Sequence, residues 1–200
     1  MPRIMRDSTV PGDIPLDGTQ LVLGYGNGNT AWDQAGWARF AHIPRATVDV
    51  TGQRWWSDVL DWEQGDVQNP QTLVNWVATK HAHALIYPPI IYVNRSNVTA
   101  AFNALNGAGF QIVRDFRLGV GTLDGTKEIP DMTGVTFVQY AGEQQTGGHY
   151  DESIVYDDAW MPGVPLPGPP QQQPRHLVGI EVPDGTVFHL TSTDGAHSWH

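Results

Sequence analysis

Eight short apolar runs, rich in valine and isoleucine, recur along about the first 160 residues, and helix-like or turn-rich stretches separate them. This alternation is typical of a parallel β-sheet covered by helices. The predicted strands span residues 3–7, 20–25, 46–50, 57–62, 90–94, 110–115, 135–140 and 153–157. Eight strands joined by crossovers predict a compact TIM-like (β/α)8 barrel. Because such barrels usually need roughly 200 to 400 residues, several helices must be trimmed. A doubly wound open sheet is the alternative.

Helical patterns are confined to three stretches, residues 32–41, 70–84 and 96–108. Residues 117–133 show no helical period, so we expect one irregular crossover there. The glycines at 24, 26 and 28 follow a predicted strand, but their G-x-G-x-G spacing differs from the dinucleotide-binding G-x-G-x-x-G pattern.

The composition changes sharply at residues 164–174, where five prolines and three glutamines favour an extended spacer. We therefore predict a barrel domain over residues 1–163, a linker over 164–174 and a C-terminal segment over 175–200. That last segment reads as a β-hairpin with a turn at Pro183–Gly185. Because an isolated hairpin is marginally stable, we expect it to dock on the barrel, another copy or a partner.

The charge balance and the absence of cysteine exclude several classes of protein. Eleven basic residues stand against twenty-one acidic ones, giving a formal charge of −10, which disfavours a nucleic-acid partner. Without cysteine there is no disulfide framework, zinc finger or thiol nucleophile. No signal peptide or membrane span is evident, so we expect synthesis in the cytoplasm and no membrane partner.

Acidic and polar residues recur at the carboxyl ends of the apolar runs. In a parallel barrel these ends meet at one rim, where the active sites of such folds lie. We predict that residues far apart in the chain converge there, namely Asp7, Asp49, Asp61, Glu63, Asn94, Gln139 and Tyr140.

Asp61 and Glu63 form the sharpest pair, because residues i and i+2 of a strand project to the same side, about 7 Å apart. Two carboxyl groups at such a short distance cannot both ionise freely, and the pKa of the less solvated one is raised. General acid catalysis on a glycosidic oxygen requires such a group. The alternative is that the D-x-E spacing forms caps or ion pairs at a strand end.

Other chemistries are less well represented. Eight tryptophans offer flat faces that suit sugar rings, although many of them fit core packing equally well. His81 and His83 lack a nearby third zinc ligand, and no G-x-S-x-G nucleophile elbow occurs. We predict neither a metal nor a cofactor.

The order of several short motifs resembles family 25 glycoside hydrolases, the lysozyme-type muramidases, and their relatives encoded by bacteria and phages. Asp7-Ser8 follows the first run, and a histidine-containing acidic stretch, G-H-Y-D-E-S, begins at Gly148. Between them stand V-L-D-W-E, I-I-Y-V and V-Q-Y, at residues 59–63, 90–93 and 138–140. The resemblance covers about residues 3–160.

This resemblance implies that Glu63 is the proton donor and Asp61 its electrostatic partner. It also implies that Asp7 is the acid of the first strand and Asp151 that of the last. We expect the cell-wall glycan to contact Tyr25, Asp49, Tyr92, Gln139 and Tyr140.

Three functions remain open at this point. The first is a peptidoglycan-directed hydrolase of β-1,4 amino-sugar linkages, released at lysis or associated with a virion. The second is a non-catalytic virion or tail component in which the barrel binds glycan and residues 175–200 contact other virion proteins. It is suggested by the short barrel and by departures such as Ser153 where the family has asparagine. The third is a cytoplasmic sugar-metabolising barrel.

Overall fold

The computed structural model describes residues 2–63, 66–83, 87–127, 133–157 and 160, together with the backbone of 178–181 and 187–190. The chain divides into two units, Met1–Gly163 and Val164–His200. Among the described helices, none combines the length and apolar character needed to cross a bilayer.

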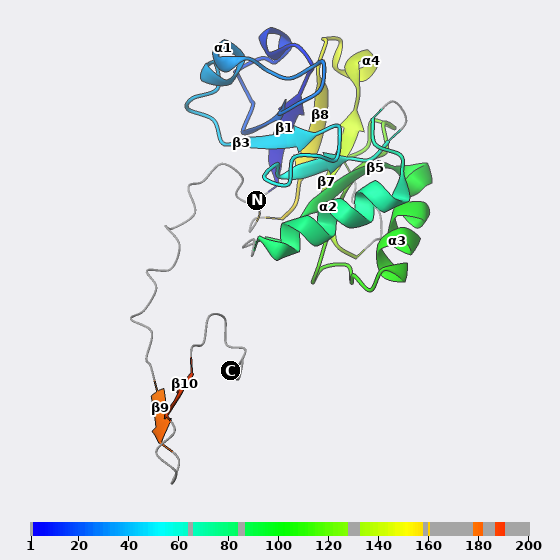
Figure 1. The fold of residues 1–200 in the computed structure, drawn as a ribbon. Helices are drawn as coiled ribbons and strands as arrows, with labels where there is room; N and C mark the ends of the chain where they lie inside the picture. The colour runs from blue at the N-terminus through cyan, green and yellow to red at the C-terminus, as the bar shows by residue number, and fades with distance from the viewer. Residues whose placement is uncertain are drawn as a thin grey trace. The chain divides into compact units, whose positions relative to one another are not determined.

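The first unit is a closed barrel in which eight strands follow one another in chain order (Figure 1). The strands are β1 (Arg3–Asp7), β2 (Leu21–Tyr25), β3 (Arg45–Asp49), β4 (Val59–Asp61), β5 (Ile90–Asn94), β6 (Arg117–Gly121), β7 (Val135–Ala141) and β8 (Asp151–Val155). Consecutive strands from β1 to β7 are parallel, but β8 runs antiparallel to both β7 and β1. The expectation of an all-parallel barrel is therefore wrong at its last strand.

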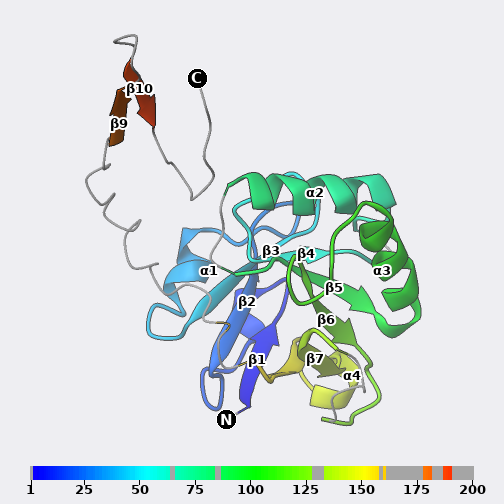
Figure 2. The same cartoon turned by 90° about the horizontal axis from the view of Figure 1, so that it is seen from below.

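The helices are fewer and shorter than a complete (β/α)8 arrangement requires. They are η1 (Pro11–Asp13), α1 (Gln34–Ala38), α2 (Pro70–Ala82), η2 (Arg95–Asn97), α3 (Val98–Gly107) and α4 (Glu143–Thr146). Figures 1 and 2 show α2 and α3 side by side on one side of the barrel. In the described part of the chain, no helix joins β3 to β4 or β6 to β7.

One predicted strand was wrong. Residues 110–115 form a turn-rich loop in which the Asp115 carboxylate accepts a hydrogen bond from the backbone of Gln111 at 2.8 Å. The strand instead lies at β6, within the stretch expected to be an irregular crossover. Two glycines interrupt the apolar signal of β6. Gly119 is required because a Cβ there would collide with the ring of Phe137 on the neighbouring strand.

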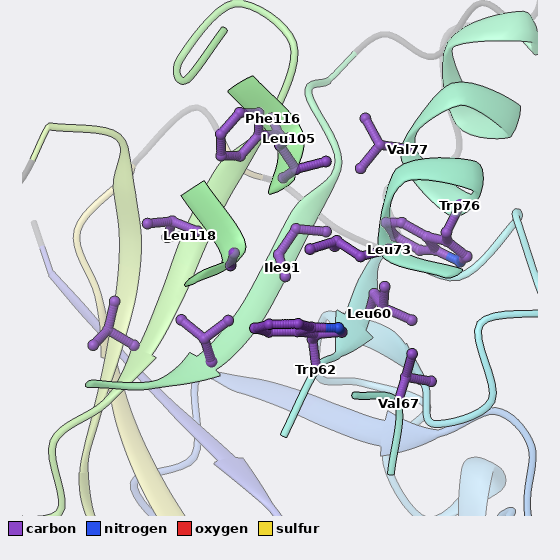
Figure 3. Packing of buried hydrophobic residues seen from close by; sticks show 13 residues of the cluster. Leu60, Trp62, Val67, Leu73, Trp76, Val77, Ile91, Leu105, Phe116 and Leu118 are labelled. Atoms are coloured by element: carbon purple, nitrogen blue, oxygen red, sulfur yellow. The ribbon is translucent and has the colours of Figure 1, made fainter. Parts of the chain in front are cut away.

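Among the described residues, the two largest of four apolar clusters form the main cores of this unit. One packs α2 and α3 against the outside of β4, β5 and β6, and Figure 3 shows side chains of α2 facing those of β4 and β5. The other is formed by alternate residues of the strands and fills the barrel interior, where Met5, Phe137 and Val155 are fully buried or nearly so.

The second unit contains one described element, an antiparallel pair of β9 (Val178–Glu181) and β10 (Val187–Leu190). Val187 pairs with Glu181 at one end of this ladder and Leu190 pairs with Val178 at the other. The predicted turn at 183–185 and the predicted linker at 164–174 lie outside the described residues.

The packing around β6 makes a prediction about stability. Gly119→Ala should lower the free energy of unfolding by about 1–3 kcal/mol, because the added methyl group must displace Phe137 in the filled interior. Gly107→Ala is the matched control, since nothing lies within 4 Å of a Cβ at that position near the end of α3. Urea unfolding of both variants tests this, and equal stabilities would contradict it.

Candidate active site

A cavity opens where β1 to β7 end and β8 begins. It offers about 350 Å³ of space that is open to solvent, and its lining consists of Asp7, Leu23, Tyr25, Val48, Asp61, Glu63, Tyr92, Gln139 and Asp151. All four acids predicted to be catalytic are therefore brought together, along with three of the five residues predicted to bind glycan. Leu23 and Val48, which were not predicted, belong to the barrel core and contribute apolar surface to the lining.

Strand geometry explains why these acids share one cavity. Met5 lies in the interior core, so Asp7, two residues later on the same strand, also points inward. Glu63 follows Asp61, the last residue of β4, at the same spacing. Asp151 is the first residue of the reversed strand β8 and pairs directly with Asp7, so the change of direction places it on the same rim.

Asp7 is one of the two most enclosed of the four acids. It is 6% exposed, and its Oδ1 atom has no hydrogen-bond partner. Burial raises its pKa well above the ordinary value, and the charges of Asp151 and Glu63 raise it further. Asp7 is thus held by the fold in a place where its ionised form is unfavourable.

Asp61 is buried to the same extent, and its Oδ1 atom also has no partner. Its pKa is raised well above the ordinary value, mainly by burial and then by the charges of Glu63, Asp66 and Asp7. A hydrogen bond with Asp66 raises the pKa of Asp61 and lowers that of Asp66.

Glu63 lies half-buried at the cavity mouth. Burial raises its pKa, the charge of Asp66 adds to the effect, and a hydrogen bond from Asn94 at the end of β5 opposes it. Asn94 was predicted at this rim, but its contact with Glu63 was not. Asp66 was missed because it lies in a loop, where no strand alternation predicts its direction.

One carboxylate oxygen from each of Asp61, Glu63 and Asp66 lies within 4.8 Å of the other two, and this spacing fits a cation in geometric terms. A hydrogen bond joins two of the three, Asp61 and Asp66. We therefore describe the group as a cluster of acids.

Asp151 completes the set of acids from the opposite wall. Gln139 Nε2 donates a hydrogen bond to its Oδ2 atom at 2.8 Å. Burial and the charge of Glu143 raise the pKa of Asp151, whereas the bond from Gln139 lowers it. The net shift is upward, so each of the four acids in the cavity resists ionisation.

Two tyrosines line the cavity beside these acids. Burial raises the pKa of both Tyr25 and Tyr92, and the surrounding carboxylates raise it further, so both phenols remain protonated and can donate hydrogen bonds. Gly121 makes room for Tyr92, because a Cβ at that position would lie 2.5 Å from the Tyr92 hydroxyl oxygen.

Asp49 does not reach the cavity, contrary to expectation. Its neighbour Val48 lines the cavity, so Asp49 points to the other side of the strand. Its oxygens accept hydrogen bonds from Asn27 Nδ2 at 2.6 Å, from Trp76 Nε1 at 3.1 Å and from backbone amides of the following loop. Burial tends to raise its pKa, but these bonds outweigh that effect and lower it.

Tyr140 is also outside the cavity, because Gln139 occupies the inward position on β7. The Tyr140 hydroxyl bonds to Glu152, and its ring packs with Val138 and Ala141 in a separate apolar cluster. Neither Asp49 nor Tyr140 lines the cavity, so the structure does not place them where a ligand would bind.

Comparison with known proteins gives little independent guidance. No family model matches the chain, and no curated protein matches it. A solved structure described as a family 25 glycosyl hydrolase from Bacillus anthracis is 13% identical, with a TM-score of 0.47, and the match covers 78% of this chain and 90% of that one. The functional proposal therefore depends on the cavity itself.

The buried acids predict how stability depends on pH. Folding raises the pKa of Asp7 above its unfolded value of about 3.8, so the folded chain binds more protons than the unfolded chain. The stabilising effect is fully present below that unfolded value and is lost as pH rises through the raised folded value. We expect urea unfolding to show a gain in stability as pH falls from about 7 to about 5.

Asp7→Asn should reduce this gain, because it removes one buried titrating group and weakens repulsion on Asp151. Asp13→Asn provides the control, since Asp13 is an exposed acid in η1 outside the cavity. A pH dependence that is the same in Asp7→Asn as in the unaltered protein would contradict the assignment.

Proposed function

We propose that this protein is a glycoside hydrolase that cleaves β-1,4 linkages between the amino sugars of peptidoglycan. The observation that carries the proposal is the pair of carboxyls at Asp61 and Glu63, which lie within 4.8 Å of each other in different surroundings. Glycosidases use two such groups, one as the proton donor and one to stabilise positive charge at the anomeric carbon. The resemblance in motif order supplies the substrate class.

Glu63 is suited to be the acid. Its raised pKa keeps it protonated closer to neutral pH than an ordinary glutamate, and its position at the mouth lets a glycosidic oxygen approach. The hydrogen bond from Asn94 occupies one side of the carboxyl group as an acceptor.

Cleavage then follows from the arrangement of charges. The bond between the anomeric carbon and the glycosidic oxygen breaks as Glu63 transfers its proton to that oxygen. The positive charge that develops on the sugar lowers the pKa of Asp61 and Asp151, which line the same cavity, and their ionised forms stabilise that charge. A water molecule afterwards adds at the anomeric carbon and returns its proton to Glu63, which restores the starting state.

The walls of the cavity fit a sugar ring. Tyr25 and Tyr92 offer protonated hydroxyls, and Gln139 holds Asp151 through its amide. Leu23 and Val48 add apolar surface. Sugar rings present hydroxyls at their edges and C–H groups on their faces, so this combination of polar donors and apolar surface suits them.

Replacement of the proposed acid gives the direct test. Glu63→Gln should lower the release of reducing ends from purified cell wall by about 100-fold or more, because the amide cannot donate a proton to the leaving oxygen. Asp13→Asn should leave the rate unchanged, since this exposed acid lies outside the cavity. If the unaltered protein releases no reducing ends from any peptidoglycan, the proposal fails.

The separation of the carboxyls predicts the stereochemistry of the reaction. Carboxyl groups about 5 Å apart are typical of enzymes that retain the anomeric configuration, whereas inverting enzymes need roughly 6.5–9.5 Å to admit a water molecule. One oxygen of Asp61 lies within 4.8 Å of one oxygen of Glu63, which favours the retaining class. Proton NMR of a soluble oligosaccharide digest should show the β-anomer first, and initial appearance of the α-anomer would exclude this pair.

A further inference from the structure

The strand pair that closes the barrel places two acids directly opposite each other. Asp7 of β1 pairs with Asp151 of β8, and both side chains line the cavity. Like charges at opposed positions of antiparallel strands repel each other and are destabilising. This repulsion is among the causes that raise the pKa of Asp7.

The hydrogen bonds of the two acids are unequal. Asp151 accepts a bond from Gln139, but the Oδ1 atom of Asp7 is buried without a partner. A buried polar atom without a partner costs free energy of folding, and such atoms in native structures call for an explanation. Asp7 also lines the open cavity, so a ligand bound there can bring a donor to this carboxyl group.

The protein itself offers no cation to this pair. Among the described residues that line the cavity there is no lysine, arginine or histidine. Arg6 precedes Asp7, but it faces the other side of the strand, where its Nε bonds to Glu152 at 2.7 Å. A cation that favours the ionised forms of Asp7 and Asp151 would therefore come from a ligand.

We propose that Asp7 and Asp151 form a receptor for the ammonium group of an amino sugar, so that the cavity prefers glycans with free amines over their N-acetylated forms. The inference rests on the proposed function, because it assigns a substrate class to the same cavity. An ammonium group carries a positive charge and several N–H donors, so it can bond to both carboxylates at once. An acetamido group is neutral and has a single N–H donor.

Two further features favour a cationic sugar. Tyr25 lines the same cavity as Asp7 and Asp151 and offers an aromatic ring there. Aromatic rings attract ammonium groups across their faces. The formal charge of −10 also attracts cationic glycans at long range, although it does not distinguish the cavity from the rest of the surface.

Calorimetric titration of two tetrasaccharides tests the proposal. A β-1,4-linked glucosamine tetramer and its N-acetylated counterpart are titrated at about pH 6, where the sugar amines are protonated, into protein carrying Glu63→Gln to prevent turnover. We expect the amine form to bind at least about tenfold more tightly. Adding Asp7→Asn should reduce this preference to less than about twofold, because one carboxylate of the receptor is lost.

Asp13→Asn in the same background is the matched control, because it removes one negative charge from an exposed position outside the cavity. It should keep the tenfold preference. Circular dichroism establishes that each variant is folded, and Asp151→Asn provides a second receptor variant with the same expected loss. Equal binding of the two sugars overturns the proposal, as does a preference that survives both receptor variants.

The test separates this inference from the proposed function. In one outcome, the protein prefers the amine form through Asp7 and yet releases no reducing ends. That outcome supports the ammonium receptor and contradicts the proposed hydrolase activity. In the converse outcome, the protein releases reducing ends through Glu63 and shows no preference for the amine form. That outcome supports the hydrolase activity and contradicts the ammonium receptor.

Discussion

The reversal of the last strand determines the chemistry of the cavity. Seven parallel strands bring their carboxyl ends to one rim, but closure by an antiparallel strand brings an amino end to the same place. Asp151, the first residue of β8, is thereby set against Asp7, the last residue of β1. A parallel eighth strand would place its first residue at the opposite end of the barrel, and this pair of acids would not form.

The concentration of acids at this rim is compatible with folding because the rest of the barrel is apolar. The strands that end in Asp7 and Asp61 also supply Met5 and Val59 to the filled interior. Burying such side chains contributes about 1.5–3 kcal/mol each, which can offset repulsion between a few carboxyls. Protonation of the acids reduces the repulsion between them further. A general acid must likewise stay protonated until it donates its proton to the substrate. The acids that the proposed reaction needs therefore lower the stability of the fold at the rim, and the apolar residues of the interior supply the stabilisation that offsets this cost.

Much of the barrel could be predicted from the sequence, because alternation of apolar and polar residues on short strands is a local signal. The same alternation correctly indicated that Asp7, Asp61 and Glu63 share one cavity. The signal failed at β6, where the packing of Phe137 and Tyr92 requires glycines and so removes apolar residues from the run. It also failed for the direction of β8, because strand direction depends on the length and path of the preceding connection.

Asp49 shows a different limit of sequence reasoning. Its type and its place at a strand end match those of the cavity acids, but the register of β3 turns it outward. There it accepts hydrogen bonds from Asn27, from Trp76 of α2 and from the loop that leads to β4. No helix covers that crossover in the described residues, and the buried carboxylate ties the loop to its neighbours. A small barrel with missing helices needs such polar anchors. An acid at a strand end is therefore a candidate for a catalytic role only when its side chain points into the barrel.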